Sequence, residues 1–206
     1  MISQQVYFHG WFYPFRVHEN KKKILCSQHL QDFLHFAMTS CPHDYFKAGP
    51  RSSKLKFLLP ISFIPVQGHE VSSLAAAALQ LSGEKTPHSK VQNFMLERDD
   101  KSIATEVPLW FTPEEMGEYE KLFGTTLPLT GHIDVLRVEE GNIWVWDFKP
   151  RAHKEKYAHT QIYFYALMLS QRTGISLENF RCGYFDEAIA YVFKPEKEAL
   201  KSTFPA

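Results

Sequence analysis

The stretch from Thr130 to Lys149 constrains the fold more than any other part of this chain. Two runs rich in β-branched and aromatic residues flank the segment Glu-Glu-Gly-Asn, a pattern that is typical of a β-hairpin. If residues 139–142 form the loop, Val138 pairs with Ile143. The sequence therefore predicts a hairpin whose register can be followed residue by residue.

That register sets two acidic side chains against each other. Asp134 falls opposite Asp147, and Lys149 points to the same face because side chains alternate along a strand. Two carboxylates about 5 Å apart repel each other and normally force one of them to hold a proton. A divalent cation such as Mg²⁺ or Mn²⁺ removes the conflict, and a neighbouring lysine then orients water or offsets developing charge. The alternative is that both carboxylates are solvated at exposed strand ends, although Asp is depleted in strands.

Both faces of the hairpin are apolar. Leu136 and Val145 share one face, and Val135, Trp146 and Phe148 share the other. A sheet that is hydrophobic on both sides must be covered by helices on both sides. The sequence therefore predicts an α/β fold with a central mixed β-sheet flanked by helices on both faces, and it places the two Asp residues at the end of a central strand pair.

Length and charge narrow the class of protein. A chain of 206 residues is long enough for one domain with a substantial core. Its 23 basic and 23 acidic residues give no global signal for nucleic acid, so any such contact depends on a local patch. No apolar run reaches the ~18 residues that span a bilayer, and the N-terminus lacks the features of a signal peptide. We expect a cytoplasmic protein that does not associate with a membrane, whose three widely spaced cysteines are reduced thiols.

The remaining elements follow from periodicity and capping signals. The pattern predicts a strand or two with a charged turn over 1–25, helices at 27–38, 71–82, 86–99 and 157–173, strands at 55–64 and 103–111, a short helix from 112, and a second hairpin over 180–193. Within the helix at 157–173, Gln161 lies four residues before Tyr165, so the two side chains share one face. There is no internal repeat and no low-complexity linker, which favours a single domain over 1–206.

Three of these segments together resemble a known family. The order Gly131-His-Ile-Asp134, Asp147-Phe-Lys149 and Gln161-x-x-x-Tyr165 is similar to the PD-(D/E)XK nuclease superfamily, in particular its RecB-like exonuclease branch. The resemblance implies a restriction-endonuclease-like core over about 86–193, preceded by an N-terminal segment of about 1–85. It also implies that Asp134 and Asp147 bind metal, that Lys149 is catalytic, and that Gln161 and Tyr165 shape the site and contact DNA.

The family also supplies a metal ligand from an upstream helix. The segment Thr86-Pro-His88 is the best match for it, and His69, after Gly68, is a competitor. The carbonyl group of Phe148 would complete the ligand set. Glu106 is either a further residue of the site or an exposed strand residue.

An N-terminal echo of the same branch bears on a second cofactor. Ser27-x-x-Leu30 followed by Cys41-Pro42 resembles the entry segment of RecB-like nucleases, some of which bind an iron–sulfur cluster through that cysteine and three C-terminal ones. Only Cys182 lies near the C-terminus, so we expect no iron–sulfur cluster.

The sequence thus favours a metal-dependent nuclease that acts on single-stranded DNA or duplex ends. Phosphate contacts are expected from Arg151, Lys154, Lys156 and His159, and base stacking from Tyr157 and Tyr163. The alternatives are a solvated basic loop at that position and, for the whole protein, an inactive nucleic-acid-binding or assembly subunit with the same fold. A small-molecule hydrolase ranks last because the chain lacks a nucleophile elbow and an HExxH motif.

Overall fold

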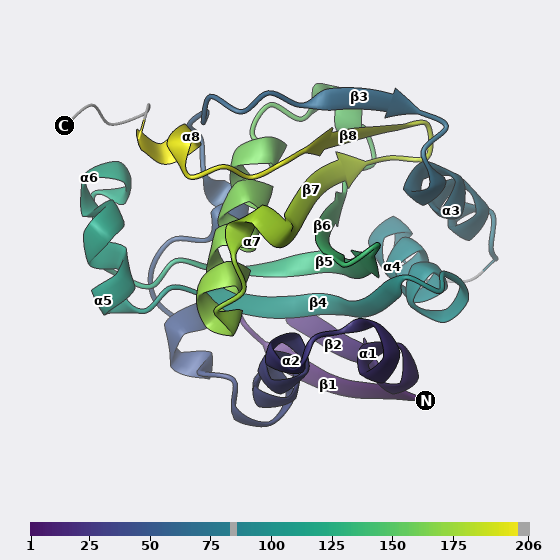
Figure 1. The fold of residues 1–206 in the computed structure, drawn as a ribbon, viewed down its shortest axis with the longest axis horizontal. Helices are drawn as coiled ribbons and strands as arrows, with labels where there is room; N and C mark the ends of the chain where they lie inside the picture. Colours follow the sequence, from purple (N-terminus) through teal and green to yellow (C-terminus); the bar gives the residue numbers. More distant parts are fainter. Residues whose placement is uncertain (83–85, 202–206) are drawn as a thin grey trace.

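One mixed sheet organises the protein. The computed structural model describes residues 1–82 and 86–201, and within them eight strands run in the order β1-β2-β4-β5-β6-β7-β8-β3 (Figure 1). The strands are β1 (Ile2–Phe8), β2 (Phe12–His18), β3 (Ile64–Gln67), β4 (Ser102–Trp110), β5 (Thr130–Glu139), β6 (Asn142–Phe148), β7 (Phe180–Phe185) and β8 (Ile189–Phe193). The α/β class and the mixed sheet predicted from the sequence are confirmed.

The central hairpin has the predicted register. β5 and β6 pair antiparallel from Glu139 opposite Asn142 to Val135 opposite Trp146. Its loop is shorter than predicted and contains only Glu140 and Gly141, both with positive φ (49° and 76°), which matches the right-handed twist of the strands. The next strand, β7, runs parallel to β6, so a crossover helix must connect the two.

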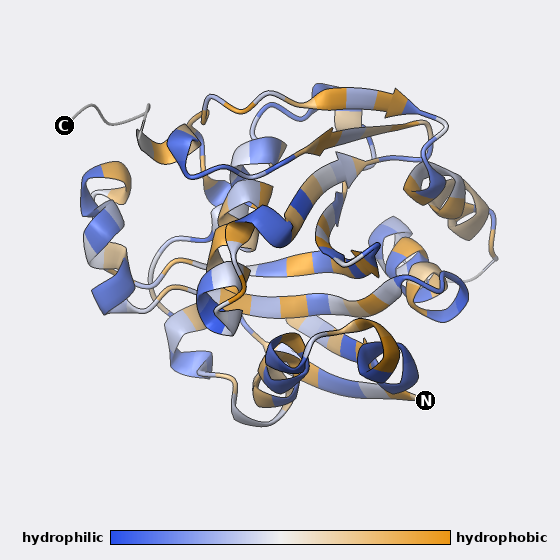
Figure 2. Ribbon diagram, in the orientation of Figure 1, coloured by the Kyte–Doolittle hydropathy of each residue, from blue (hydrophilic) through white to orange (hydrophobic). Residues whose placement is uncertain are grey.

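Helices cover both faces of the sheet, as predicted. That crossover helix, α7 (Ala158–Thr173), and α2 (Gln28–Ser40) pack on one face, whereas α3 (Glu70–Leu79) and α4 (Pro87–Arg98) pack on the other (Figure 1). Each face has its own core: Leu136 and Val145 belong to the α7 side, and Val135, Trp146 and Phe148 to the α4 side. Hydrophobic residues recur along the strands, and the helices alternate between hydrophobic and hydrophilic residues (Figure 2).

The predicted helices begin and end near the expected residues. Ser27 occupies the N-cap position of α2, although its side chain makes no capping hydrogen bond. The Thr86 hydroxyl accepts the backbone N–H of Ser89 at the start of α4, where Pro87 has no N–H that would need a partner. Gly174 ends α7 in the left-handed conformation. The shorter helices are η1 (His43–Phe46), η2 (Ser52–Lys54), α5 (Pro113–Met116), η3 (Gly117–Tyr119), α6 (Glu120–Phe123), η4 (Ala152–Lys154), η5 (Leu177–Asn179) and α8 (Glu198–Lys201).

Two predictions in the N-terminal half are wrong. The charged turn near residue 20 is a helix, α1 (Glu19–Leu25), because the His18 side chain caps it and Lys21 donates to the carbonyl groups of Leu96 and Asp99. The strand predicted over 55–64 does not form. This segment runs beside α7, where the backbone N–H of Leu59 donates to the Thr160 hydroxyl, and the strand β3 starts only at its end.

None of the helices in the described residues is both long and apolar enough to cross a membrane.

Candidate active site

The end of the central hairpin gathers the predicted site residues. Asp134 and Asp147 are buried one step beyond the last paired residues of β5 and β6. An Asp134 carboxylate oxygen accepts the backbone N–H of Phe148 at 2.9 Å, and Asp147 forms an ion pair with Lys149 at 2.6 Å. The two carboxylates and the lysine therefore lie at the same end of the same two strands.

Helix α7 adds two side chains to this group. The Gln161 amide donates to Asp147 at 3.2 Å and to the Tyr165 hydroxyl at 2.8 Å, and its oxygen accepts the Lys149 ammonium at 3.2 Å. Gln161 thus fixes the positions of both ionic partners. The glycine of the Gly-x-x-Asp motif makes room for this helix, because a Cβ atom at Gly131 would overlap the Tyr165 ring.

A third carboxylate shares the site. Glu106 lies in β4 with a φ of 52°, a conformation that is strained for a residue other than glycine. The Gln92 side chain on α4 donates to its carboxylate at 2.7 Å. Burial, together with the charge of Asp147, raises the pKa of Glu106 to about 7, although the hydrogen bond from Gln92 and the charge of Arg51 oppose the shift.

The same crowding acts on Asp134. Burial, and then the charges of Asp147 and Glu106, raise the pKa of Asp134 well above its ordinary value, while Lys149 opposes the shift. Three carboxylates around one space thus repel each other, and the Lys149 ammonium offsets only part of their charge.

His88 approaches the carboxylates from the start of α4. Its Nε2 atom lies 3.8 Å from an Asp134 carboxylate oxygen, and its side chain is 44% exposed. Burial lowers the pKa of His88, while the charge of Asp147 and a hydrogen bond to the Phe148 backbone raise it. The lowered pKa favours neutral imidazole, the form that coordinates a metal.

These groups line a cavity of about 320 Å³. Another wall of this cavity comes from the β1–β2 turn and the start of β2, with Trp11, Phe12 and Tyr13, and from Arg51 just before η2. The guanidinium of Arg51 lies 5.1 Å from the centre of the Tyr13 ring and donates to the Tyr13 hydroxyl. This wall was not predicted from the sequence, because the run Trp-Phe-Tyr carries no signal for the distant segment that it contacts.

The donor set fits a hard divalent cation. Carboxylate oxygens with an optional imidazole are the ligands that Mg²⁺ and Mn²⁺ prefer, and three mutually repelling carboxylates have an electrostatic need for positive charge. Lys149 holds Asp147 in an ion pair, so that pair must loosen for Asp147 to become a ligand.

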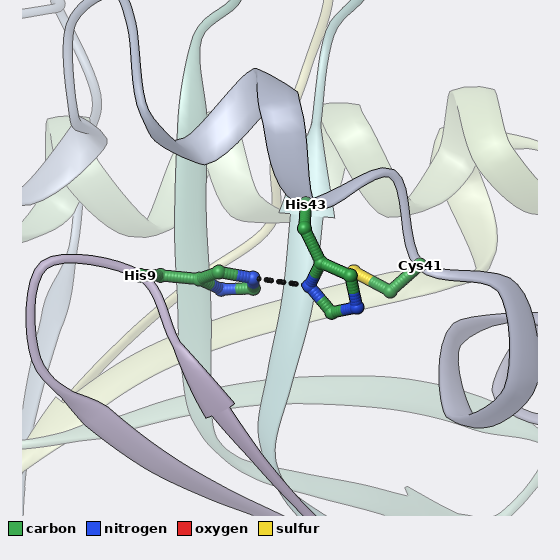
Figure 3. Close-up of side chains that lie close together, drawn as sticks. All are labelled: His9, Cys41 and His43. Atoms are coloured by element: carbon green, nitrogen blue, oxygen red, sulfur yellow. Dashed lines mark hydrogen bonds between the residues drawn. The ribbon is translucent and has the colours of Figure 1, made fainter.

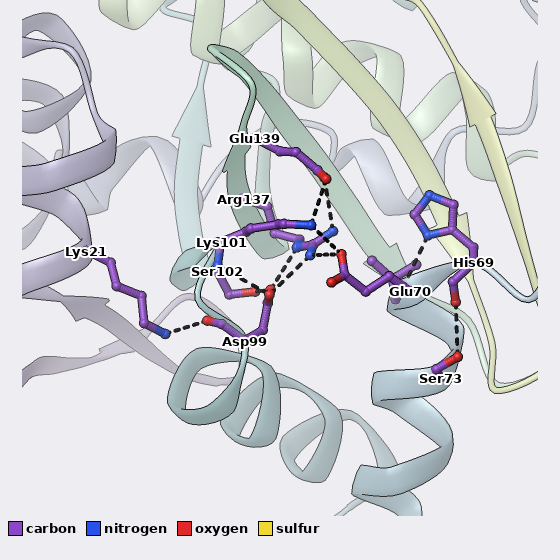
Figure 4. Close-up of polar contacts among 10 residues, drawn as sticks. Lys21, His69, Glu70, Ser73, Asp99, Lys101, Ser102, Arg137 and Glu139 are labelled. Atoms are coloured by element: carbon purple, nitrogen blue, oxygen red, sulfur yellow. Dashed lines mark hydrogen bonds and ion pairs between the residues drawn. The ribbon is translucent and has the colours of Figure 1, made fainter.

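Several other predicted residues lie elsewhere. His69 is the N-cap of α3 and accepts the backbone N–H of Val71. It lies beside the charged cluster that includes Glu70, Asp99 and Arg137 (Figure 4) and does not line the cavity. Its role as an alternative ligand is therefore not supported. Arg151, Lys154 and Lys156 are exposed on the loop between β6 and α7 and do not line the cavity either.

Two of the predicted substrate contacts are wrong. Tyr163 is fully buried, and its hydroxyl donates to the carbonyl group of Glu196, so it cannot stack on a base. His159 is buried too, and burial lowers its pKa, so it offers no positive charge to phosphate. Tyr157 is half-buried, and its ring lies within 5.3 Å of the Lys56 ammonium and 5.4 Å of the Lys156 ammonium.

Comparison with known proteins identifies the family. Residues 67–202 match the family model described as the PD-(D/E)XK nuclease superfamily. No curated protein and no solved structure matches the chain. The matched range contains His88, the β5–β6 hairpin and the Gln161–Tyr165 face of α7, and nucleases of this superfamily generally use divalent metal ions.

Proposed function

The chain belongs to the PD-(D/E)XK nuclease superfamily, and on that premise we propose that it is a metal-dependent deoxyribonuclease that hydrolyses DNA phosphodiester bonds in an exonuclease-like manner. The observation that carries the proposal is the bonded set of Asp147, Lys149 and Gln161, which lines one cavity together with Asp134. The resemblance to the RecB-like branch supports the exonuclease mode.

In this proposal the acidic residues hold the metal. Asp134, Asp147 and the Phe148 carbonyl are the central ligands, His88 is the ligand from α4, and Glu106 is near enough to join them. A bound Mg²⁺ or Mn²⁺ ion would polarise the scissile phosphate and lower the pKa of a water molecule.

The side chains around the metal have distinct tasks. Lys149, released from Asp147, orients the attacking water and offsets negative charge in the transition state. Gln161 keeps Lys149 and Asp147 in place, since it bonds to each of them. The buried Tyr165 hydroxyl holds the Gln161 amide in turn.

The substrate is proposed to enter between the end of the β5–β6 hairpin and the cavity wall formed by Trp11, Phe12 and Tyr13. Arg51 at the cavity, and Arg151, Lys154 and Lys156 on the exposed loop, are proposed to bind phosphate groups, which their positive charge supports. Tyr157, with the ammonium groups of Lys56 and Lys156 near its ring, is proposed to stack on an unpaired base. Single-stranded DNA and duplex ends suit this arrangement better than an intact duplex.

A cleavage assay tests the proposal. The protein is incubated with end-labelled single-stranded and duplex DNA in Mg²⁺, Mn²⁺ or EDTA, beside Asp147→Ala, Lys149→Ala and the matched control Asp100→Ala, which changes an exposed residue. We expect metal-dependent shortening of DNA that falls at least about 100-fold in the first two variants and is unchanged in the third.

Other outcomes are equally informative. DNA retardation without cleavage would support the inactive binding or assembly subunit. No interaction with any nucleic acid would contradict both functions.

A further inference from the structure

A second cluster of ligand-type side chains lies outside the carboxylate site. His9 follows β1, Cys41 ends α2 and His43 starts η1, and the three side chains converge (Figure 3). Within the described residues, they are the one group of three His, Cys, Asp or Glu side chains whose ligand atoms all lie within 4.8 Å of one another. His9 and Cys41 are buried, whereas His43 reaches the surface.

We propose that His9, Cys41 and His43 form a metal site for Zn²⁺, distinct from the carboxylate site. One thiolate and two imidazoles are a borderline-soft donor set, which suits Zn²⁺ and does not suit Mg²⁺. Three protein ligands leave a fourth position for water, and the exposed side of His43 gives the ion an entry path.

The geometry is close to what zinc requires. The Nε2 atom of His9 and the Nδ1 atom of His43 are 2.8 Å apart, and two nitrogens in a tetrahedral site with Zn–N of about 2.0–2.1 Å are about 3.3 Å apart. The two nitrogens therefore need to move apart by only about half an ångström to admit the ion. The ring of Phe46 stacks on His9 at 3.7 Å and the edge of Tyr7 meets His43, so both rings are already held near their binding positions.

The hydrogen bonds around the metal-free cluster determine which ring nitrogens carry a proton. Arg51 can only donate, so the Nδ1 atom of His132, 3.2 Å from it, accepts. The Nε2–H of His132 then donates to Nδ1 of His9 at 3.0 Å, and the Nε2–H of His9 donates to His43. In this series of hydrogen bonds, His132 and His9 each carry a proton on Nε2.

Zinc binding would replace the hydrogen bond between His9 and His43 and reverse the one between His132 and His9. The proton on Nε2 of His9 leaves, His9 takes a proton on Nδ1 from His132, and His132 takes one on its own Nδ1. The net product is the one proton lost from the Cys41 thiol.

The reversal has a consequence for Arg51. Because Nδ1 of His132 would now carry a proton, Arg51 must give up this contact and keep its bonds to the His9 carbonyl group and the Tyr13 hydroxyl. Arg51 also lines the carboxylate cavity, so the two sites share one neighbouring side chain.

Metal analysis tests the site without any activity assay. EDTA-stripped protein is mixed with ZnCl₂, freed of excess ion by gel filtration, and measured for bound zinc. Cys41→Ser and His43→Ala remove ligands, Asp147→Ala removes the carboxylate site, and Cys26→Ser and His35→Ala are matched controls on the same part of the chain. We expect one equivalent of zinc in the wild type, the controls and Asp147→Ala, and a loss of at least 10-fold in affinity, roughly what loss of a supporting partner already costs, in Cys41→Ser and His43→Ala.

A Co²⁺ spectrum of the wild-type protein gives a second test, which does not depend on whether the ligand variants fold. Co²⁺ bound to the wild-type protein should give a thiolate-to-cobalt charge-transfer band, which Asp147→Ala retains. A wild-type protein that binds no zinc, zinc binding that survives Cys41→Ser, or a cobalt complex without a thiolate band would overturn the proposal. Loss of zinc in Asp147→Ala would assign the ion to the carboxylate site instead.

Discussion

Glu106 shows how a single residue records the electrostatics of the site. It has positive φ, it is a carboxylic acid with a raised pKa, and it lies in β4, where Gln92 of α4 bonds to it. A strained backbone and an unfavourable charge at one position are costs that a folded protein carries where function requires them.

The pKa of Glu106 leads to a prediction about stability. Because the folded protein raises this pKa to about 7, the stabilising contribution of Glu106 is fully present below the pKa of an ordinary Glu and is lost as the pH rises through about 7. Gln resembles the protonated acid and keeps the bond to Gln92. Glu106→Gln should therefore make the metal-free protein more stable at pH 8, by about 1–3 kcal/mol, and leave it unchanged near pH 4. Urea unfolding in EDTA measures the difference, and a gap that does not vary with pH would contradict the assignment.

At the scale of elements, a buried arginine joins three parts of the fold. Arg137 on β5 is fully buried and bonds to both carboxylate oxygens of Asp99, at the end of α4, at 2.8 and 3.1 Å (Figure 4). Its guanidinium also bonds to Glu70 on α3 at 2.7 Å. The helices that cover one face of the sheet are thus attached to the strand that carries Asp134.

Removing the carboxylate of Asp99, the buried partner of Arg137, should destabilise the fold strongly. Asp99→Ala leaves Arg137 without its main counter-ion, and we expect a loss of about 3–5 kcal/mol, against less than about 0.5 kcal/mol for the exposed neighbour in Asp100→Ala. The pKa of Asp99 is lowered despite burial, because Arg137 favours its charged form. This contribution is present above the pKa of an ordinary Asp and is lost as the pH falls through the folded value, so the gap between wild type and Asp99→Ala should narrow in acid. Denaturation at pH 7 and at pH 3 checks both the size and the sign.

The individual elements differ in how well they could be predicted from the sequence. The β5–β6 hairpin, α4 and α7 were predictable because alternation, caps and helical periodicity are local signals. Helix α1 was not, since Lys21 is bound by carbonyl groups about 75 residues away, and β3 was not, because it forms only against the edge of β8. The candidate site divides in the same way: the motif residues were found from spacing, whereas the wall formed by Trp11, Phe12 and Arg51 depends on a contact between distant segments.

For the whole molecule, the position of the β1–β2 hairpin is the most informative feature. This hairpin is one edge of the sheet, yet its turn reaches the end of the central strands and forms part of the cavity. Its tip exposes large aromatic side chains, with Trp11 72% and Phe12 64% exposed. Side chains so exposed do little for stability, so a binding role explains them better.

The proposed function gives this tip a task that can be measured. If Trp11 stacks on an unpaired base, Trp11→Ala in the Asp147→Ala background should weaken binding of a single-stranded oligonucleotide by about 5- to 150-fold, since stacking is worth about 1–3 kcal/mol per base. Phe36→Ala is the matched control, because Phe36 is an exposed aromatic residue on α2 that does not line this cavity. Phosphate contacts weaken steeply with salt, whereas stacking does not. The fold-loss caused by Trp11→Ala in an anisotropy titration should therefore be the same at low and high salt, and a loss that disappears at high salt would show that the tip acts only by placing the nearby cations.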